Sequence, residues 1–285
     1  MKLVRFGPCG AERPGIWIEE TGSDPRILDV RAMAYDIEDY DTRFFAGNGL
    51  DRVAFLVREP NRILRPADGV RLGPPTKCTG TIICLGKNYG DHIQEFDSRI
   101  PERPLLFSKA LSSINGPFDP IRIPPDAVNV DGEVELAAVI GRCACRVSAG
   151  TALEYVAGYT VLNDVTDRAA QRGDGQWFRG KSADTFCPIG PFLVTPDEID
   201  SAGRRLFSRL NGEILQDGKT SQMLFKLPDI IAFISHSFTL HPGDIVSTGT
   251  PAGVGSARQP PLYLKHGDTL ETIVEGIGHQ TCRVE

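Results

Sequence analysis

Residues 130–141 read VDGEVELAAVIG, in which two glutamates stand two positions apart directly before an apolar run. The run from Leu136 to Ile140 is typical of a buried strand. Residues i and i+2 of a strand point to the same face, so Glu133 and Glu135 are expected to converge where this strand begins. Two ionised carboxylates at the mouth of a buried segment are costly unless a positive charge compensates them.

A divalent cation would supply the missing positive charge by binding oxygens of both glutamates. Asp164, at the end of the apolar run VAGYTVLND, is the best candidate for a third carboxylate ligand. Oxygen ligands without paired cysteines favour Mg²⁺, Mn²⁺ or Ca²⁺ over zinc or copper. The alternative is a solvent-exposed strand edge, because E-x-E at the start of a strand more often has that role.

A second candidate group lies in GKNYGDHIQEF, residues 86–96. His92 and Glu95 are three positions apart, so on a helical turn they share a face. Glu95 would then accept a hydrogen bond from one ring nitrogen of His92. That bond fixes the tautomer and raises the basicity of the other nitrogen, as a general base requires. The alternative is a solvated surface helix in which the pair has no chemical role.

Short β-rich runs such as TIICLG, LLFSK and DIVSTGT dominate the chain after residue 74, and turn residues separate them. Helical pieces such as LPDIIAFISHS do not alternate with them regularly. This pattern predicts an α+β, β-rich sandwich, roll or barrel with peripheral helices. Asn211-Gly212 predicts a type I′ hairpin turn. The Pro/Gly-rich segment RPADGVRLGPPTK predicts a boundary between a small N-terminal domain, residues 1–74, and a domain spanning residues 75–285. Within the small domain, a polar stretch predicts a helix near residues 34–47.

The composition limits the class of protein. The chain has 285 residues, 41% hydrophobic and 24% charged, with a net charge of −6 and no block of like charges, so we do not expect a nucleic-acid partner. No signal peptide and no apolar stretch of about 18 residues is present, so we expect a cytoplasmic protein with no membrane partner. Seven dispersed cysteines without C-x-x-C predict free, mostly buried thiols. G-x-G-x-x-G, Walker A and G-x-S-x-G motifs are absent.

Six motifs in order resemble those of the fumarylacetoacetate hydrolase superfamily, and the resemblance covers about residues 76–285. They are G-x-N-Y-x-x-H-x-x-E (86–95), LFSK ending at Lys109, E-x-E-L-A-x-V-I-G (133–141), GYTVLNDVTDR (158–168), GQWFRGKSADTFCPIGP (175–191) and LHPGDIVSTGTPAGVG (240–255). Each motif is weak alone, but the ordered set is specific.

The resemblance implies a mixed β-sandwich roll with a small N-terminal domain, usually in a homodimer. It implies that the three acidic residues hold Mg²⁺ or Mn²⁺, with Ca²⁺ as an alternative in crystals, and that His92 and Glu95 activate water. Lys181 would be a third catalytic residue, near the metal. The substrate-binding residues implied by the resemblance are Lys109, Arg168, Gln171 and Thr250.

The implied activity is hydrolysis of a C–C bond in a diketo acid through a metal-bound enolate. MKLVRFG…PGI resembles the opening of long bacterial members named ureidoglycolate lyase or sugar-acid diketo-hydrolase, so the expected substrate is a 2,4-diketo-3-deoxy sugar acid or an acylpyruvate. The alternatives are oxaloacetate decarboxylation, tautomerisation or isomerisation of a 2-oxo acid, ureidoglycolate lyase activity, and a non-catalytic binding scaffold. Residues 95–104 are a candidate lid, and Lys87 has no assigned role.

Overall fold

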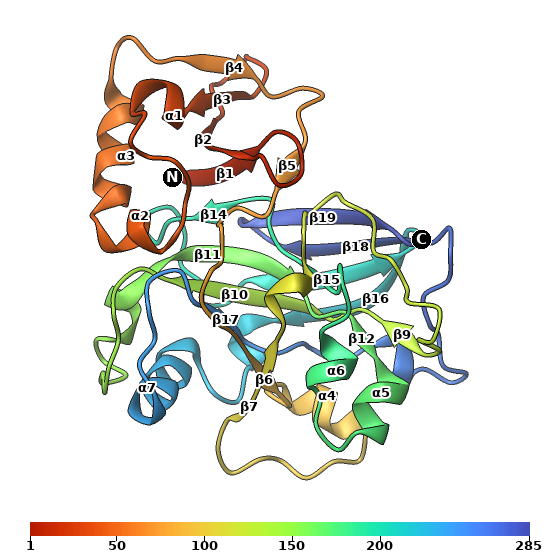
Figure 1. Cartoon of the computed structure of the whole chain (residues 1–285). Helices are drawn as coiled ribbons and strands as arrows, with labels where there is room; N and C mark the ends of the chain where they lie inside the picture. Colours follow the sequence, from red (N-terminus) through yellow and green to blue (C-terminus); the bar gives the residue numbers. More distant parts are fainter.

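The computed structural model describes residues 1–285 and contains two principal β-sheets with short helices at their edges (Figure 1). One sheet has eleven strands and the other has four; two further pairs of very short strands complete the β-structure. The strand-rich sandwich roll with peripheral helices, expected from the sequence, is confirmed.

The bounds of the elements are as follows. The large sheet contains β1 (Lys2–Phe6), β2 (Arg13–Ile18), β3 (Arg26–Asp29), β4 (Leu64–Pro66), β5 (Leu72–Gly73), β6 (Ile82–Gly86), β7 (Leu105–Lys109), β10 (Val134–Ile140), β11 (Val156–Asn163), β14 (Leu193–Val194) and β17 (Ile245–Ser247). The four-stranded sheet contains β15 (Arg205–Leu210), β16 (Glu213–Lys219), β18 (Thr269–Val274) and β19 (Gly278–Arg283). The short pairs are β9 (Val130–Asp131) with β12 (Thr166–Asp167), and β8 (Ile114–Asn115) with β13 (Cys187–Pro188). The helices are α1 (Val30–Met33), α2 (Thr42–Ala46), α3 (Gly49–Arg58), α4 (Gly90–Glu95), α5 (Arg168–Gly173), α6 (Phe178–Lys181) and α7 (Leu227–Ser237).

Strand β10 is buried on both faces, which explains its continuous apolar sequence. Val134, Leu136 and Ala138 belong to a core cluster that also holds residues of β15, β18 and α7. Ala137 and Val139 point to the opposite face and pack in a cluster with residues of the N-terminal strands. The strand thus lies between two cores, and the side chains at its first residues are shielded from water as well.

The N-terminal strands extend the large sheet. The strand order is β4-β3-β2-β1-β14-β11-β10-β17-β6-β7, and β1 pairs with β14 in the antiparallel register Leu3↔Leu193. The division into domains at residue 74 stays a prediction. The helix expected near 34–47 is wrong in its bounds: 34–41 are not helical, because the Asp41 side chain caps a helix that starts only at Thr42, accepting a hydrogen bond from Phe44 N.

Several local predictions can be compared with the structure. Asn211 and Gly212 have φ values of 52° and 87° between β15 and β16, as a type I′ turn requires. The seven cysteines are free, as expected, but three of them are exposed and only three are fully buried, so the expectation of mostly buried thiols is wrong. The chain contains no helix with both the length and the apolar character to cross a membrane.

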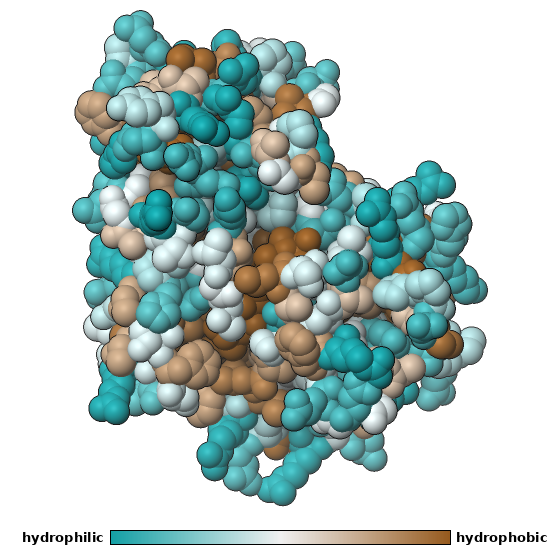
Figure 2. All heavy atoms as spheres, viewed as in Figure 1, coloured by the Kyte–Doolittle hydropathy of each residue, from teal (hydrophilic) through white to brown (hydrophobic).

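Apolar side chains gather over the middle of one face of the molecule, where β6 and β7 lie, with hydrophilic residues around them (Figure 2). Leu105 of β7 and Leu111, just after it, are among the exposed large hydrophobic residues. Strand β7 is also the last strand of the large sheet on this side, so its outer edge is unpaired within the chain.

Gly158 permits the close approach of β11 and β14, and its replacement tests this packing. A Cβ atom at Gly158 would lie 2.7 Å from Val194 O and 2.9 Å from the Leu193 side chain. We expect Gly158→Ala to lower the free energy of unfolding by about 1–3 kcal/mol, the usual cost of overpacking. Chemical denaturation measures this, with Gly150→Ala as the control because a Cβ there meets only Ser148 Oγ, at 3.8 Å. An equal loss in both variants would contradict the expectation.

Candidate active site

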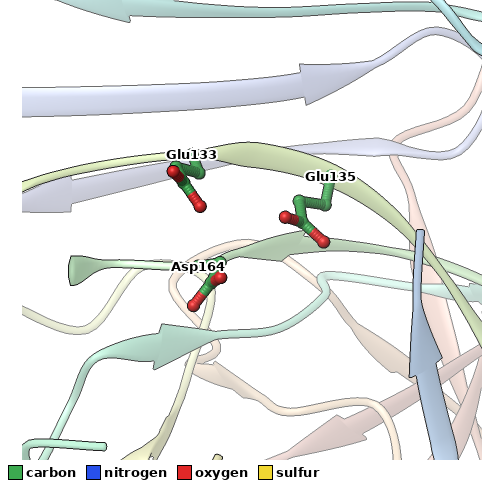
Figure 3. Close-up of side chains that lie close together, drawn as sticks. All are labelled: Glu133, Glu135 and Asp164. Carbon is green, nitrogen blue, oxygen red and sulfur yellow. The ribbon is translucent and has the colours of Figure 1, made fainter. Parts of the chain in front are cut away.

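The antiparallel pairing of β10 and β11 brings three carboxylates together. The register Val134↔Asn163 places Glu133, just before β10, opposite Asp164, just after β11, and Asp164 N donates to Glu133 O at 2.9 Å. Glu135 shares the face of Glu133, so all three side chains converge (Figure 3). Each residue offers an oxygen within 4.8 Å of those of the other two, and all three residues are buried. We call these residues the acidic triad.

Three cations compensate part of the charge of the acidic triad. Lys181 Nζ lies 2.7 Å from Glu133 Oε2 and 2.5 Å from Asp164 Oδ2. Lys109 Nζ contacts Asp164 Oδ1 at 2.6 Å. The Arg168 guanidinium donates to Glu133 Oε1 at 2.6 Å, and also at 2.6 Å to the buried Asp131. Four buried carboxylates thus face three cations, which leaves one negative charge uncompensated.

Glu135 is the carboxylate without a cation. It accepts hydrogen bonds only from neutral donors, the Ser247 hydroxyl and Gly249 N. Burial, together with the charges of Asp164 and Glu133, raises the pKa of Glu135 well above its usual range. Burial alone would also raise the pKa of Glu133, but Arg168 and Lys181 outweigh it and hold that pKa below its usual range.

This arrangement fits a divalent cation. The donors are all carboxylate oxygens, the ligands that Mg²⁺, Mn²⁺ and Ca²⁺ prefer. The charge left over at Glu135 is the one that such an ion would neutralise. Lys181 already contacts the other two members of the acidic triad, so a bound ion would share those carboxylates with the ammonium group.

His92 and Glu95 form the contact that their spacing predicts. Both lie on α4, and His92 Nδ1 is 2.8 Å from Glu95 Oε1. Gly253 N donates to the other oxygen, Glu95 Oε2, at 2.8 Å. Because an ionised carboxylate can only accept hydrogen bonds, Glu95 favours the tautomer with the proton on Nδ1, in which Nε2 is the free basic nitrogen. The ring of Phe96 contacts the imidazole edge-on, with centroids 5.3 Å apart.

A pocket of about 460 Å³ connects the acidic triad with this pair. Its wall includes Glu133, Glu135, His92 and Lys181, so both predicted groups reach one cavity. The volume is within the range usual for small-molecule sites. Phe96 and Ser98, from the predicted lid segment, line the same pocket; whether the segment closes over a substrate stays a prediction.

Three of the four expected substrate-binding residues line the pocket, namely Arg168, Gln171 and Thr250. Lys109 does not. Its side chain is fully buried, and Nζ contacts Asp164, Val165 O and Lys181 O. The structure therefore places Lys109 behind the acidic triad, where it would position Asp164 instead of contacting a substrate. Lys109 ends the strand segment LFSK, and nothing in that sequence indicates that its side chain is buried.

Sequence reasoning missed several residues that build the site. Asp131 holds Arg168, and Ser247 holds Glu135. Asp131 stands two positions before Glu133, so the alternation of a strand could have indicated it. Trp177 lines the pocket and packs so closely over Gly86 that a Cβ atom there would lie 2.4 Å from the indole. No local signal indicates that contact, because its partners are 91 positions apart in the sequence.

Comparisons with known proteins agree with this geometry. Residues 81–285 match the family described as fumarylacetoacetate (FAA) hydrolase C-terminal. The chain is 41% identical to a mitochondrial oxaloacetate tautomerase of Rattus norvegicus, over 98% of this chain and 90% of the relative. It is 40% identical to a 2,4-didehydro-3-deoxy-L-rhamnonate hydrolase of a Sphingomonas strain, over 100% and 96%. A solved fumarylacetoacetate hydrolase from Exiguobacterium antarcticum superposes with a TM-score of 0.86 at 40% identity, covering 100% of this chain and 99% of the other.

Proposed function

The chain belongs to the fumarylacetoacetate hydrolase family, and we propose that it hydrolyses a C–C bond in a diketo acid of the 2,4-diketo-3-deoxy sugar acid or acylpyruvate type. Membership of this family, together with the named relatives, shows that the chain is an enzyme with hydrolase, isomerase or tautomerase activity on oxo acids. The proposal of C–C bond hydrolysis depends mainly on one observation, the 2.8 Å contact between His92 and Glu95 at the pocket of the acidic triad. Hydrolysis needs a base that activates water, and this pair can supply it.

Glu133, Glu135 and Asp164 would hold the cation, with Mg²⁺ or Mn²⁺ as the proposed ion and Ca²⁺ as an alternative in crystals. When bound, the ion supplies Lewis acidity toward the oxygens of an oxo acid and lowers the energy of negative charge that develops there. The protein contributes by keeping the three carboxylates converged, through the β10–β11 register and the fixed lysines behind them.

His92 would move the proton. Nε2 takes a proton from water, and the resulting hydroxyl group adds to the carbonyl carbon remote from the acidic triad. The C–C bond then breaks, and the proton passes from Nε2 to the departing carbon, so that a carboxylic acid and a 2-oxo acid are released. Glu95 keeps the imidazole oriented and stabilises its protonated form. We expect this base to contribute roughly 10²–10⁴-fold to the rate.

Lys181 is the proposed source of positive charge beside the reacting oxygens. Its Nζ is buried and lies between Glu133 and Asp164. Although burial lowers the pKa of an ammonium group, these carboxylates raise the pKa of Lys181 above its usual range, so the group stays charged. A fixed charge in a shielded site stabilises negative charge that grows during the reaction.

A second candidate is oxaloacetate decarboxylation or tautomerisation of a 2-oxo acid on the same site. The 41% identity to an oxaloacetate tautomerase favours it. Neither reaction requires the attack of activated water, so the two candidates differ in their need for His92. Ureidoglycolate lyase activity is a further alternative within the same subgroup.

Metal removal tests the proposal directly. Dialysis against EDTA is expected to abolish cleavage of acylpyruvates and 2,4-diketo-3-deoxy sugar acids, and added Mg²⁺ or Mn²⁺ should restore it. Binding should also stabilise the fold, by about 2.7 kcal/mol when the free metal exceeds its Kd a hundredfold. Turnover is followed by chromatography of the products and stability by thermal unfolding. Full activity in EDTA would refute the metal dependence, and failure to cleave any diketo acid would favour the second candidate.

We also propose a homodimer located in the cytoplasm. The exposed apolar side chains of Leu105 and Leu111 and the unpaired edge of β7 support a contact with a second copy, on a face where apolar side chains gather (Figure 2). A small oxo acid is the proposed partner, with neither nucleic acid nor membrane involved. Light scattering of the purified protein tests the dimer, and a mass of 31.1 kDa would contradict it.

A further inference from the structure

Two cations of the pocket wall have no partner in the protein. Five side chains that can carry positive charge line the pocket. Arg168 and Lys181 are paired with carboxylates of the buried cluster, and His92 is bonded to its glutamate. Lys87 and Arg172 line the same cavity but form no hydrogen bond or ion pair with any side chain. They are therefore the cations available to an anionic ligand.

The remainder of the wall offers no competing negative charge. The acidic residues that line the pocket are Glu133 and Glu135, both in the acidic triad. The neighbouring side chains Phe107 and Trp177 are aromatic and contact each other edge to face, with ring centroids 5.2 Å apart. The pocket thus combines a metal-binding end, an apolar surface and two free cations.

The backbone around Lys87 is held firmly. Lys87 is half-buried between β6 and α4 and has a φ of 56°, a left-handed conformation that costs a non-glycine residue about 1–2 kcal/mol. The side chain of the next residue, Asn88, donates to Thr248 O at 2.8 Å and to Phe225 O at 3.1 Å. Lys87 also lines a shallow depression beside the pocket, where the nearby acid Glu102 is already paired with Arg99.

We propose that Lys87 and Arg172 form a second carboxylate site, and that the enzyme takes oxo acids with a distal carboxylate in preference to those with a neutral chain. Arg172 can donate two parallel N–H bonds to a carboxylate, and Lys87 adds a point charge. The inference rests on the proposed function in one respect: it assumes that the oxo-acid end of the ligand binds at the acidic triad. It narrows the substrate to the acylpyruvate type with a carboxylate at its far end.

Binding of matched ligands to the Mg²⁺-loaded protein tests this without turnover. Calorimetry would compare 2-oxoglutarate with 2-oxopentanoate, and 2-oxoadipate with 2-oxohexanoate, pairs that differ in the terminal carboxylate. We expect the best dicarboxylate to bind at least about tenfold more tightly than its neutral counterpart. Lys87→Met and Arg172→Met should each reduce this ratio several-fold. In the double variant, the loss of binding free energy for the dicarboxylate should be smaller than the sum of the losses in the two single variants, because both groups would hold the same carboxylate.

Arg179→Met is the matched control. Arg179 is exposed on α6, is paired with Asp174 and does not line the pocket, so its loss should leave the affinity ratio unchanged. Equal affinities within each ligand pair, or an unchanged ratio in the Lys87 and Arg172 variants, would overturn the inference. If the enzyme hydrolyses diketo acids but shows no preference for a distal carboxylate, this inference alone is refuted. If it prefers ligands with a distal carboxylate but hydrolyses no diketo acid, the proposed hydrolase reaction alone is refuted.

Discussion

Glu135→Gln is expected to abolish both Mg²⁺ binding and catalysis, and at the same time to stabilise the metal-free protein. The variant loses an ionised ligand, so the site no longer supplies the charge that the cation neutralises. In the metal-free protein, however, Glu135 is a buried carboxylate with neutral donors only, and its replacement removes repulsion from Glu133 and Asp164. The amide oxygen can still accept the bonds from Ser247 and Gly249.

The pH dependence of this effect has a definite sign. Since the pKa of Glu135 is raised in the folded protein, the folded state holds this proton more tightly than the unfolded chain. The resulting stability is fully present below the usual glutamate pKa of about 4.5 and is lost as the pH rises through the higher folded pKa. Metal-free wild-type protein should therefore lose stability relative to the variant as the pH rises above about 4.5.

Glu133→Gln is the contrasting control, since Glu133 is paired with Arg168 and Lys181. Its replacement takes one of two carboxylate partners from each of these buried cations, which keep Asp131 and Asp164 respectively, so we expect this variant to be destabilised. Denaturant titrations at several pH values and calorimetric Mg²⁺ titration measure both variants. If Glu135→Gln bound Mg²⁺ with wild-type affinity, or were destabilised as strongly as Glu133→Gln, the assignment of the uncompensated charge to Glu135 would be wrong.

His92→Ala is expected to lower the rate of diketo acid hydrolysis by roughly 10²–10⁴-fold while Mg²⁺ affinity stays nearly constant. The reason is that His92 supplies the free Nε2 base but is not a member of the acidic triad. Single-turnover kinetics and a calorimetric metal titration on the same preparation separate the two effects. His236→Ala is the control, because His236 is exposed on α7 and only contacts the backbone of its own helix.

The outcome also distinguishes the two candidate reactions. Collapse of hydrolysis with intact metal binding supports water activation by His92 and Glu95. Retained turnover of oxaloacetate in the variant, without any hydrolysis by the wild-type enzyme, would instead support decarboxylation or tautomerisation. Loss of Mg²⁺ binding in His92→Ala would contradict the separation of the base from the metal site.

The sequence predicted the contacts that depend on local periodicity. Glu133 and Glu135 share one face because a strand alternates, and His92 reaches Glu95 because a helical turn repeats after three to four residues. The Asn211-Gly212 turn follows from backbone preferences of two residues. The ordered motifs also indicated the family, which the match over residues 81–285 confirms. The helix bounds near 34–47 were wrong because capping by one side chain decided them.

Only the tertiary structure decided how the charges of the site are balanced. Lys109, Arg168 and Lys181 come from three separate elements, and their distances to the acidic triad depend on strand register and on packing of α5 and α6. The same packing buries Lys109 behind Asp164 and leaves Lys87 and Arg172 without a partner in the pocket wall. Electrostatic energy depends on distance and burial in three dimensions, and neither quantity is contained in the spacing of residues along one strand or helix.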